Sequence, residues 1–186
     1  MRVDPGVYVP RPQSEQLARR AAELLPAGGL AIDLCTGSGA IARVMGDAHP
    51  SARVVATDAD ERAVACARSN GVDAFAGELF DPLPAGLAAN VVVGVLPYVP
   101  TPDLPLLQRD TLTFESPLSY DGGPDGLDLV RRAVAQAPAW LRPGGRLLLE
   151  LGEGQPELLD LSAFRGVRVL RDEDGDVRGV EGALAV

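Results

Sequence analysis

The chain has 186 residues, of which 46% are apolar, and a formal net charge of −9. This length fits one domain with a sizeable core, and the acidic balance, in a chain without lysine, argues against a nucleic-acid-binding surface. The sequence has neither an apolar run of about 18 residues nor a signal-peptide core, so we expect no membrane span. Cys35 and Cys66 lack metal-ligand and redox spacing, which predicts no metal site and a cytoplasmic protein with reduced thiols.

Short apolar runs alternate with amphipathic segments along most of the chain, and Gly and Pro mark the breaks. In order, the first half predicts an extended start at 5–12, a helix at 14–25 capped by Ser14, a strand at 29–33, a helix from 41, a strand at 53–58, a helix at 61–69, and strands at 72–75 and 90–96. The second half predicts a proline-rich loop at 101–124, a helix at 125–141 kinked by Pro138, a turn at 142–145, a strand at 146–151, a helix at 156–163 and a hairpin of strands at 166–170 and 177–186. This alternation is typical of an α/β fold.

The turn between the first strand and its helix contains Gly37 and Gly39. Glycine allows a sharp turn and leaves room for a ligand, and the helix that follows presents free N–H groups. Asp58 ends the next strand, 21 residues after Gly37, where a carboxylate can accept hydrogen bonds from the two hydroxyls of a ribose. The sequence therefore predicts a cofactor that contains adenosine.

Two such cofactors fit the glycine turn. Gly37-Ser-Gly39-Ala-Ile-Ala42 satisfies the loose dinucleotide fingerprint, which would suggest NAD. However, the chain ends in a hairpin instead of a second mononucleotide half, and the fourth strand runs into a Leu-Pro-Tyr turn for which a nicotinamide site has no evident use. These two features favour a different adenosine cofactor.

Nearly the whole chain resembles the HemK/PrmC-type S-adenosylmethionine-dependent methyltransferases, which modify the side-chain amide of glutamine in proteins. The motifs that carry the resemblance are Val9-Pro-Arg-Pro12 with Glu15, Asp33 to Ile41 with Cys35 in place of a glycine, Gly77-Glu-Leu-Phe80 with Asp81-Pro-Leu83, Phe114-Glu-Ser-Pro117, Gly122 to Leu127, and Leu141 to Gly152 with Gln155. In the family the first of these motifs usually reads Pro-Arg-Pro-Glu-Thr-Glu, whereas here it reads Pro-Arg-Pro-Gln-Ser-Glu.

The resemblance implies a Rossmann-like class I methyltransferase with S-adenosylmethionine as cofactor. We expect a single domain over 1–186, with a seven-stranded, mostly parallel sheet, a C-terminal antiparallel hairpin and helices on both faces. Residues 1–28 would form an N-terminal segment and helix, and residues 97–124 a substrate-facing loop. The implied cofactor-binding residues are Pro10, Arg11, Asp33, Thr36, Gly37, Ser38, Gly39, Asp58, Ala59, Glu78 and Leu79. The implied catalytic residues are Val95, Leu96, Pro97 and Tyr98.

The roles of several of these residues are open. Asp33 is expected to contact the methionine end of the cofactor, and Glu78 suits the adenine amino group, although it could be a surface charge. Tyr98 could be a core aromatic, but a strand end in an open sheet faces the crevice where ligands bind. Arg11 is as easily explained by a structural role.

The sequence departs from the family in two ways. The catalytic tetrapeptide Asn-Pro-Pro-Tyr is replaced by Val95-Leu-Pro-Tyr98, and the chain starts without the N-terminal helical domain of the release-factor enzymes, like shorter relatives. The substrate is expected to be a glutamine-containing protein loop, and a small activating partner protein is an open expectation. The alternatives are a small-molecule N- or O-methyltransferase and a cofactor-binding protein without catalysis.

Overall fold

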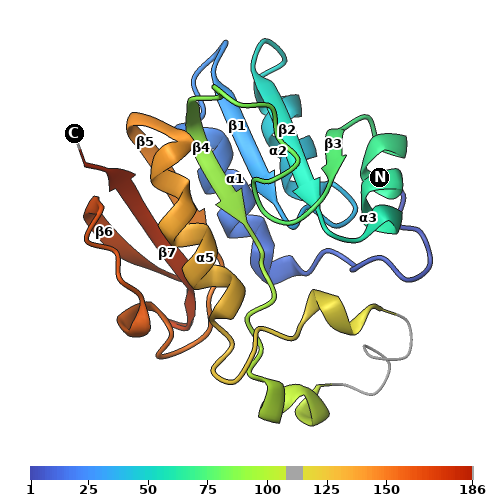
Figure 1. The fold of residues 1–186 in the computed structure, drawn as a ribbon, viewed down its shortest axis with the longest axis vertical. Coiled ribbons are helices and arrows are strands. Elements are labelled where there is room, and N and C mark those ends of the chain that lie inside the picture. The colour runs from blue at the N-terminus through green and yellow to red at the C-terminus, as the bar shows by residue number, and fades with distance from the viewer. Residues whose placement is uncertain (108–114, 186) are drawn as a thin grey trace.

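The computed structural model describes residues 1–107 and 115–185. Seven strands form one sheet in the order β3-β2-β1-β4-β5-β7-β6 (Figure 1). Strands β1 to β5 pair in parallel, and β7 runs antiparallel to β5 and β6. The strands are Leu30–Leu34 (β1), Arg53–Asp58 (β2), Asp73–Ala76 (β3), Ala89–Gly94 (β4), Leu141–Leu149 (β5), Phe164–Arg171 (β6) and Val177–Leu184 (β7). The predicted sheet with its C-terminal hairpin is confirmed.

Helices cover both faces of this sheet. The α-helices are Glu15–Leu24 (α1), Ala40–Ala48 (α2), Glu61–Ser69 (α3) and Asp128–Gln136 (α5), and the 3-10 turns are Pro12–Ser14, Thr101–Leu106, Pro117–Ser119, Ala137–Ala139 and Pro156–Leu158. Side chains alternate between faces along a strand. Val92 accordingly packs in the cluster that contains Val130 of α5, whereas Val91 and Val93 pack in the cluster that contains Leu17 of α1. In Figure 1, α5 lies in front of the sheet and α1 behind it.

The start of α1 differs from the prediction. Ser14 occupies the N-cap position, but its side chain makes no capping hydrogen bond, and its Oγ is buried without a partner among the described residues. A cap normally has extended backbone, whereas the 3-10 turn ahead of α1 gives Ser14 helical angles (φ −79°, ψ −8°). Expecting Ser14 to cap the helix was therefore wrong.

Helix α5 is shorter than predicted at both ends. Asp125 Oδ1 accepts a hydrogen bond from the Leu127 N–H, a local turn that precedes the helix and delays its start to Asp128. At the other end the chain tightens into a 3-10 turn around Pro138, which has no N–H to donate to the preceding helical turn.

Two further segments after β4 differ from the prediction. The predicted helix at 156–163 is only a 3-10 turn, because Asp160 Oδ1 accepts from the Ser162 N–H and starts another turn. The predicted turn at 142–145 lies within β5, where the pairing jumps from Leu141 to Arg146. Part of the predicted loop, residues 108–114, lies outside the described residues.

None of the helices in the described ranges combines the length and apolar character needed to cross a bilayer.

Candidate functional site

A cavity of about 400 Å³ lies at the carboxyl ends of β1, β2 and β4, and residues of the N-terminal segment form part of its wall. Most of the predicted site residues line it: Pro10, Arg11, Asp33, Thr36, Gly37, Ser38, Asp58, Ala59, Val95, Leu96, Pro97 and Tyr98. Gly39, Glu78 and Leu79 do not line it. The structure thus brings both groups of predicted site residues, cofactor-binding and catalytic, to one cavity.

Asp33 is a buried acid that lines this cavity. Its Oδ2 accepts hydrogen bonds from the Thr36 hydroxyl (2.6 Å) and the Ala42 N–H (3.1 Å), while its Oδ1 has no partner among the described residues. Burial raises the pKa of Asp33 to about 7 despite these two bonds. A buried carboxylate oxygen without a partner favours a ligand that brings a hydrogen-bond donor, such as an ammonium group.

The glycine turn is tied to the end of β2. The Gly37 N–H donates to Asp58 Oδ2 (2.8 Å), and the Asp60 N–H donates to Asp58 Oδ1 (2.9 Å). Burial raises the pKa of Asp58, and the two backbone bonds oppose that rise. Each oxygen has capacity for a second hydrogen bond, so Asp58 can still receive two ribose hydroxyls.

Gly39 serves packing instead of lining the cavity. It has a φ of +86°, and a Cβ there would lie 2.8 Å from Cγ2 of Val72 and 3.2 Å from Cβ of Ala67. The glycine therefore allows the start of α2 to approach α3. Cys35, at the position where the family has glycine, adopts a φ of +53° and lines the cavity; burial raises the pKa of its thiol.

Glu78 lies at the surface, where it pairs with Arg132 of α5 at 2.6 Å. That guanidinium lowers the pKa of the Glu78 carboxyl. Leu79 is buried in the core next to it. Glu78 would have to leave Arg132 before it could bind adenine, so its predicted role stays a proposal.

The Val95–Tyr98 segment forms a wall of the cavity that Asp33 and Asp58 also line. Val95 is half-buried and packs against the cluster on the α1 face, and Leu96 is buried in the core. The Tyr98 hydroxyl donates to Oε1 of the buried Glu150 (2.9 Å), and burial, followed by the Glu150 charge, raises the pKa of Tyr98. Tyr98 is therefore held in place by Glu150 while it lines the cavity.

The backbone of the Val95–Tyr98 wall packs closely against two glycines, and a glutamine side chain forms a hydrogen bond to it. A Cβ on Gly126 would lie 2.2 Å from the Tyr98 carbonyl oxygen, and one on Gly122 would lie 2.7 Å from the Pro97 carbonyl oxygen. The Gln155 side chain donates from Nε2 to the same Tyr98 carbonyl (2.8 Å). These contacts give a physical reason for the glycines between residues 122 and 126.

Three side chains attach the N-terminal segment to residues 115–120, and we call this cluster the clasp: Arg11, Glu115 and Tyr120. Arg11 Nη2 lies 2.8 Å from Oε1 of Glu115 and 3.0 Å from the Tyr120 hydroxyl, which donates to Oε2 of Glu115. Glu115 is buried, and Gly6 forms a parallel bridge with it. Arg11 thus has a visible structural role as part of the cavity wall.

Among the cavity residues without a predicted role are the polar side chains of Tyr8, Gln13 and Tyr120. The Tyr8 ring lies 5.3 Å from Cζ of Arg11 and 5.6 Å from the Tyr120 ring, and burial raises the pKa of Tyr8 to about 12. Tyr8 and Gln13 directly flank the Val9-Pro-Arg-Pro12 motif, which is the signal that could have identified them.

The residues present fit an adenosyl sulfonium. Asp33 Oδ1 and Ser38 Oγ are buried, line the cavity and lack partners among the described residues, and Asp58 lies beside them. Asp33 would hold the ammonium of the methionine end, and Asp58 the ribose hydroxyls. No group of three or more His, Cys, Asp or Glu side chains within 1–107 and 115–185 is arranged to bind a metal ion.

Comparison with known proteins identifies the class. Residues 13–78 match the family model described as the methyltransferase small domain. A 16S rRNA methyltransferase from T. thermophilus, solved with S-adenosylmethionine and guanosine, superposes with a TM-score of 0.66 at 19% identity, over 99% of this chain and 42% of that one. The superposition shows a shared fold; the class, an S-adenosylmethionine-dependent methyltransferase, follows from the family match and from the more similar relatives described next.

The similarity extends to a particular family. A release factor glutamine methyltransferase from Geobacter sulfurreducens is 35% identical over 98% of this chain and 67% of its own length. A protein-(glutamine-N5) methyltransferase, release factor-specific, from Alicyclobacillus acidocaldarius is 26% identical with a TM-score of 0.61, and each chain is covered completely. The chain belongs to the release factor glutamine methyltransferase family and spans about two thirds of the length of its curated relatives. Its cofactor is therefore S-adenosylmethionine and not NAD.

We expect Asp58→Ala to weaken cofactor binding by about 1–3 kcal/mol, because the ribose hydroxyls lose a half-buried hydrogen-bond partner. Calorimetry with S-adenosylmethionine measures this loss directly. Asp73→Ala is a suitable control, since Asp73 is exposed on β3 and lies outside the cavity. An unchanged affinity in the Asp58 variant would remove Asp58 from the binding site.

Cofactor affinity should rise with pH up to and through about 7. Asp33 has a pKa raised from 3.8 to about 7, so it is largely protonated below that pH, whereas an ammonium ligand prefers the ionised form. The same shift makes Asp33 favour the folded state most at low pH, an effect lost as pH rises from about 4 to 7. Calorimetry in buffers of different ionisation enthalpy should detect proton release on binding, and Asp33→Asn should abolish it. A flat pH profile for the wild-type protein would contradict the assignment.

Proposed function

We propose that this protein transfers the methyl group of S-adenosylmethionine to the side-chain amide nitrogen of a protein glutamine. The observation that supports this most directly is the shared cavity, which Val95–Tyr98 line together with Asp33 and Asp58. Relatives named as release factor glutamine methyltransferases support the same acceptor.

The chemistry requires alignment more than acid–base strength. When bound, S-adenosylmethionine supplies an activated methyl group on a sulfonium. Asp33 would hold the methionine end of the cofactor, and Asp58 would hold its ribose. The backbone of the Val95–Tyr98 wall would hold the acceptor nitrogen in line with the methyl carbon. The N-terminal segment would keep water out of the cavity.

Val95 limits how well an amide can be held. The Val95 carbonyl can accept one N–H of the acceptor amide, but the valine side chain offers neither an acceptor nor a donor. We therefore propose a slow glutamine methyltransferase. The second candidate is a small-molecule N- or O-methyltransferase. It is favoured by the apolar Val95 side chain, which lacks the amide group that would hold a glutamine. A protein that binds cofactor without catalysis is the third.

Mass spectrometry of a Gly-Gly-Gln peptide incubated with the protein and methyl-labelled S-adenosylmethionine tests the proposal. One labelled methyl group on the glutamine is the expected result. Label on a small metabolite and none on the peptide would favour the second candidate. Cofactor binding without any labelled product would favour the third.

A cytoplasmic location and a small activating partner protein belong to this proposal. Support for the location comes from the free thiols Cys35 and Cys66. A higher rate of methylation after addition of a purified candidate protein would support the existence of an activating partner.

A further inference from the structure

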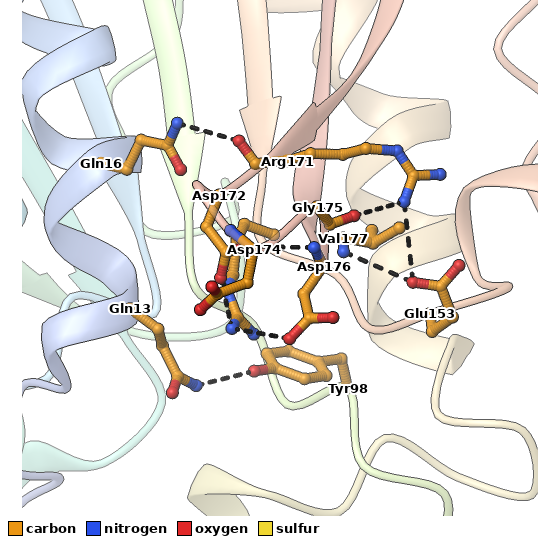
Figure 2. A network of polar contacts seen from close by, with 11 residues as sticks. Gln13, Gln16, Tyr98, Glu153, Arg171, Asp172, Asp174, Gly175, Asp176 and Val177 are labelled. Atoms are coloured by element: carbon orange, nitrogen blue, oxygen red, sulfur yellow. Dashed lines mark hydrogen bonds and ion pairs between the residues drawn. The ribbon is translucent and has the colours of Figure 1, made fainter.

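The Gln13 side chain is a polar group that lines the cavity and has no assigned role. It lines the cavity together with Val95, Pro97 and Tyr98, and it is the one side-chain amide among the described lining residues. It is exposed and belongs to the turn that leads into α1. Figure 2 shows Gln13 reaching toward the Tyr98 hydroxyl, while Gln16 points to the backbone of Arg171.

The neighbours of Gln13 favour one orientation of its amide. The Tyr98 hydroxyl has one proton, and it donates that proton to the buried Glu150. The Tyr98 oxygen can then only accept from Gln13, so Gln13 turns its Nε2 toward Tyr98, at 3.4 Å. Oε1 consequently lies at the opposite end of the amide. At 3.4 Å the bond is long, so little is lost if the amide shifts toward a ligand.

We propose that Gln13 recognises the acceptor amide and is a specificity-determining residue of this methyltransferase; this rests on the proposed glutamine substrate. Its Oε1 accepts an N–H of the acceptor and replaces the acceptor oxygen that Val95 lacks. A carboxylate in the acceptor position would face this oxygen without a proton between them. Gln13 therefore favours glutamine over glutamate.

Binding measurements test this independently of turnover. Calorimetry with Gly-Gly-Gln and Gly-Gly-Glu peptides is carried out in the presence of S-adenosylhomocysteine, the demethylated cofactor. Gln13→Ala should weaken binding of the glutamine peptide about three- to tenfold and reduce the preference over the glutamate peptide. Gln13→Glu keeps an acceptor oxygen and adds a charge, so it should increase that preference. Cofactor affinity should be unchanged in both variants.

Gln16→Ala is the matched control, because Gln16 is an exposed glutamine of the same region that does not line the cavity. It should leave both peptide affinities unchanged. If the wild-type protein binds and methylates the glutamine peptide and Gln13→Ala alters neither affinity nor preference, the role of Gln13 is overturned while the proposed function stands. If the wild-type protein neither binds nor methylates that peptide, both are overturned.

Discussion

Val95→Asn is expected to raise methylation of a Gly-Gly-Gln peptide roughly 3- to 100-fold. Asparagine at the end of β4 offers an oxygen for an N–H of the acceptor and an amide group for its carbonyl. One or two such bonds contribute about 0.5–1.5 kcal/mol each, and they raise the rate if they tighten in the transition state. Initial rates with saturating cofactor, measured by transfer of labelled methyl groups, give the ratio.

Two control variants separate the amide from other effects of this substitution. Val95→Ala removes side-chain volume from the wall without adding a polar group, so it should not raise the rate. Val44→Asn makes the same chemical change on an exposed face of α2 and should leave activity unchanged. If the wild-type protein already methylates the peptide efficiently and Val95→Asn adds nothing, the backbone carbonyl and Gln13 together suffice.

Gly126→Ala is expected to lower the free energy of unfolding by about 2–5 kcal/mol and to reduce activity strongly. Two costs add. Alanine at a φ of +79° is strained by roughly 1–2 kcal/mol, and a Cβ placed 2.2 Å from the Tyr98 carbonyl oxygen overpacks the wall at a cost of about 1–3 kcal/mol. Denaturant unfolding gives the stability, and the peptide assay gives the rate.

Gly144→Ala carries the first cost alone, so the difference between the two variants isolates the second. Gly144 has a similar φ of +75°, but no atom outside its chain neighbours lies within 4 Å of a Cβ there. This variant should lose only about 1–2 kcal/mol of stability and keep its activity. Equal losses in the two variants would show that contact with Tyr98 is unimportant.

The sequence predicted best what depends on neighbours along the chain. The bounds of β2 and α3, residues 53–58 and 61–69, match the prediction because the apolar run of β2 and the break at Asn70-Gly71 after α3 are local signals. Helix ends were predicted less well, because hydrogen bonds such as Asp125 to Leu127 compete with helix formation.

The cavity could be placed from the sequence, but not its walls. The glycine turn and Asp58 lie close together because β1 and β2 are adjacent parallel strands. No periodic pattern relates Tyr98 to Glu150, or Arg11 to Glu115, because these pairs form only when distant segments pack together. Glu78 is the reverse case: its motif suggested a ligand, and the fold places it beside Arg132.

The clasp also bears on how the protein is made. Arg11 and its partner Glu115 are 104 positions apart, so the N-terminal segment is synthesised long before it can be fixed in place. At a translation rate of roughly 5–20 residues per second, that interval is about 5–20 seconds. Until then Arg11 lacks its Glu115 partner, and the cavity lacks the wall that residues 115–121 support. We therefore expect a nascent chain released before residue 115 not to retain cofactor, even though the first four strands are already present in it.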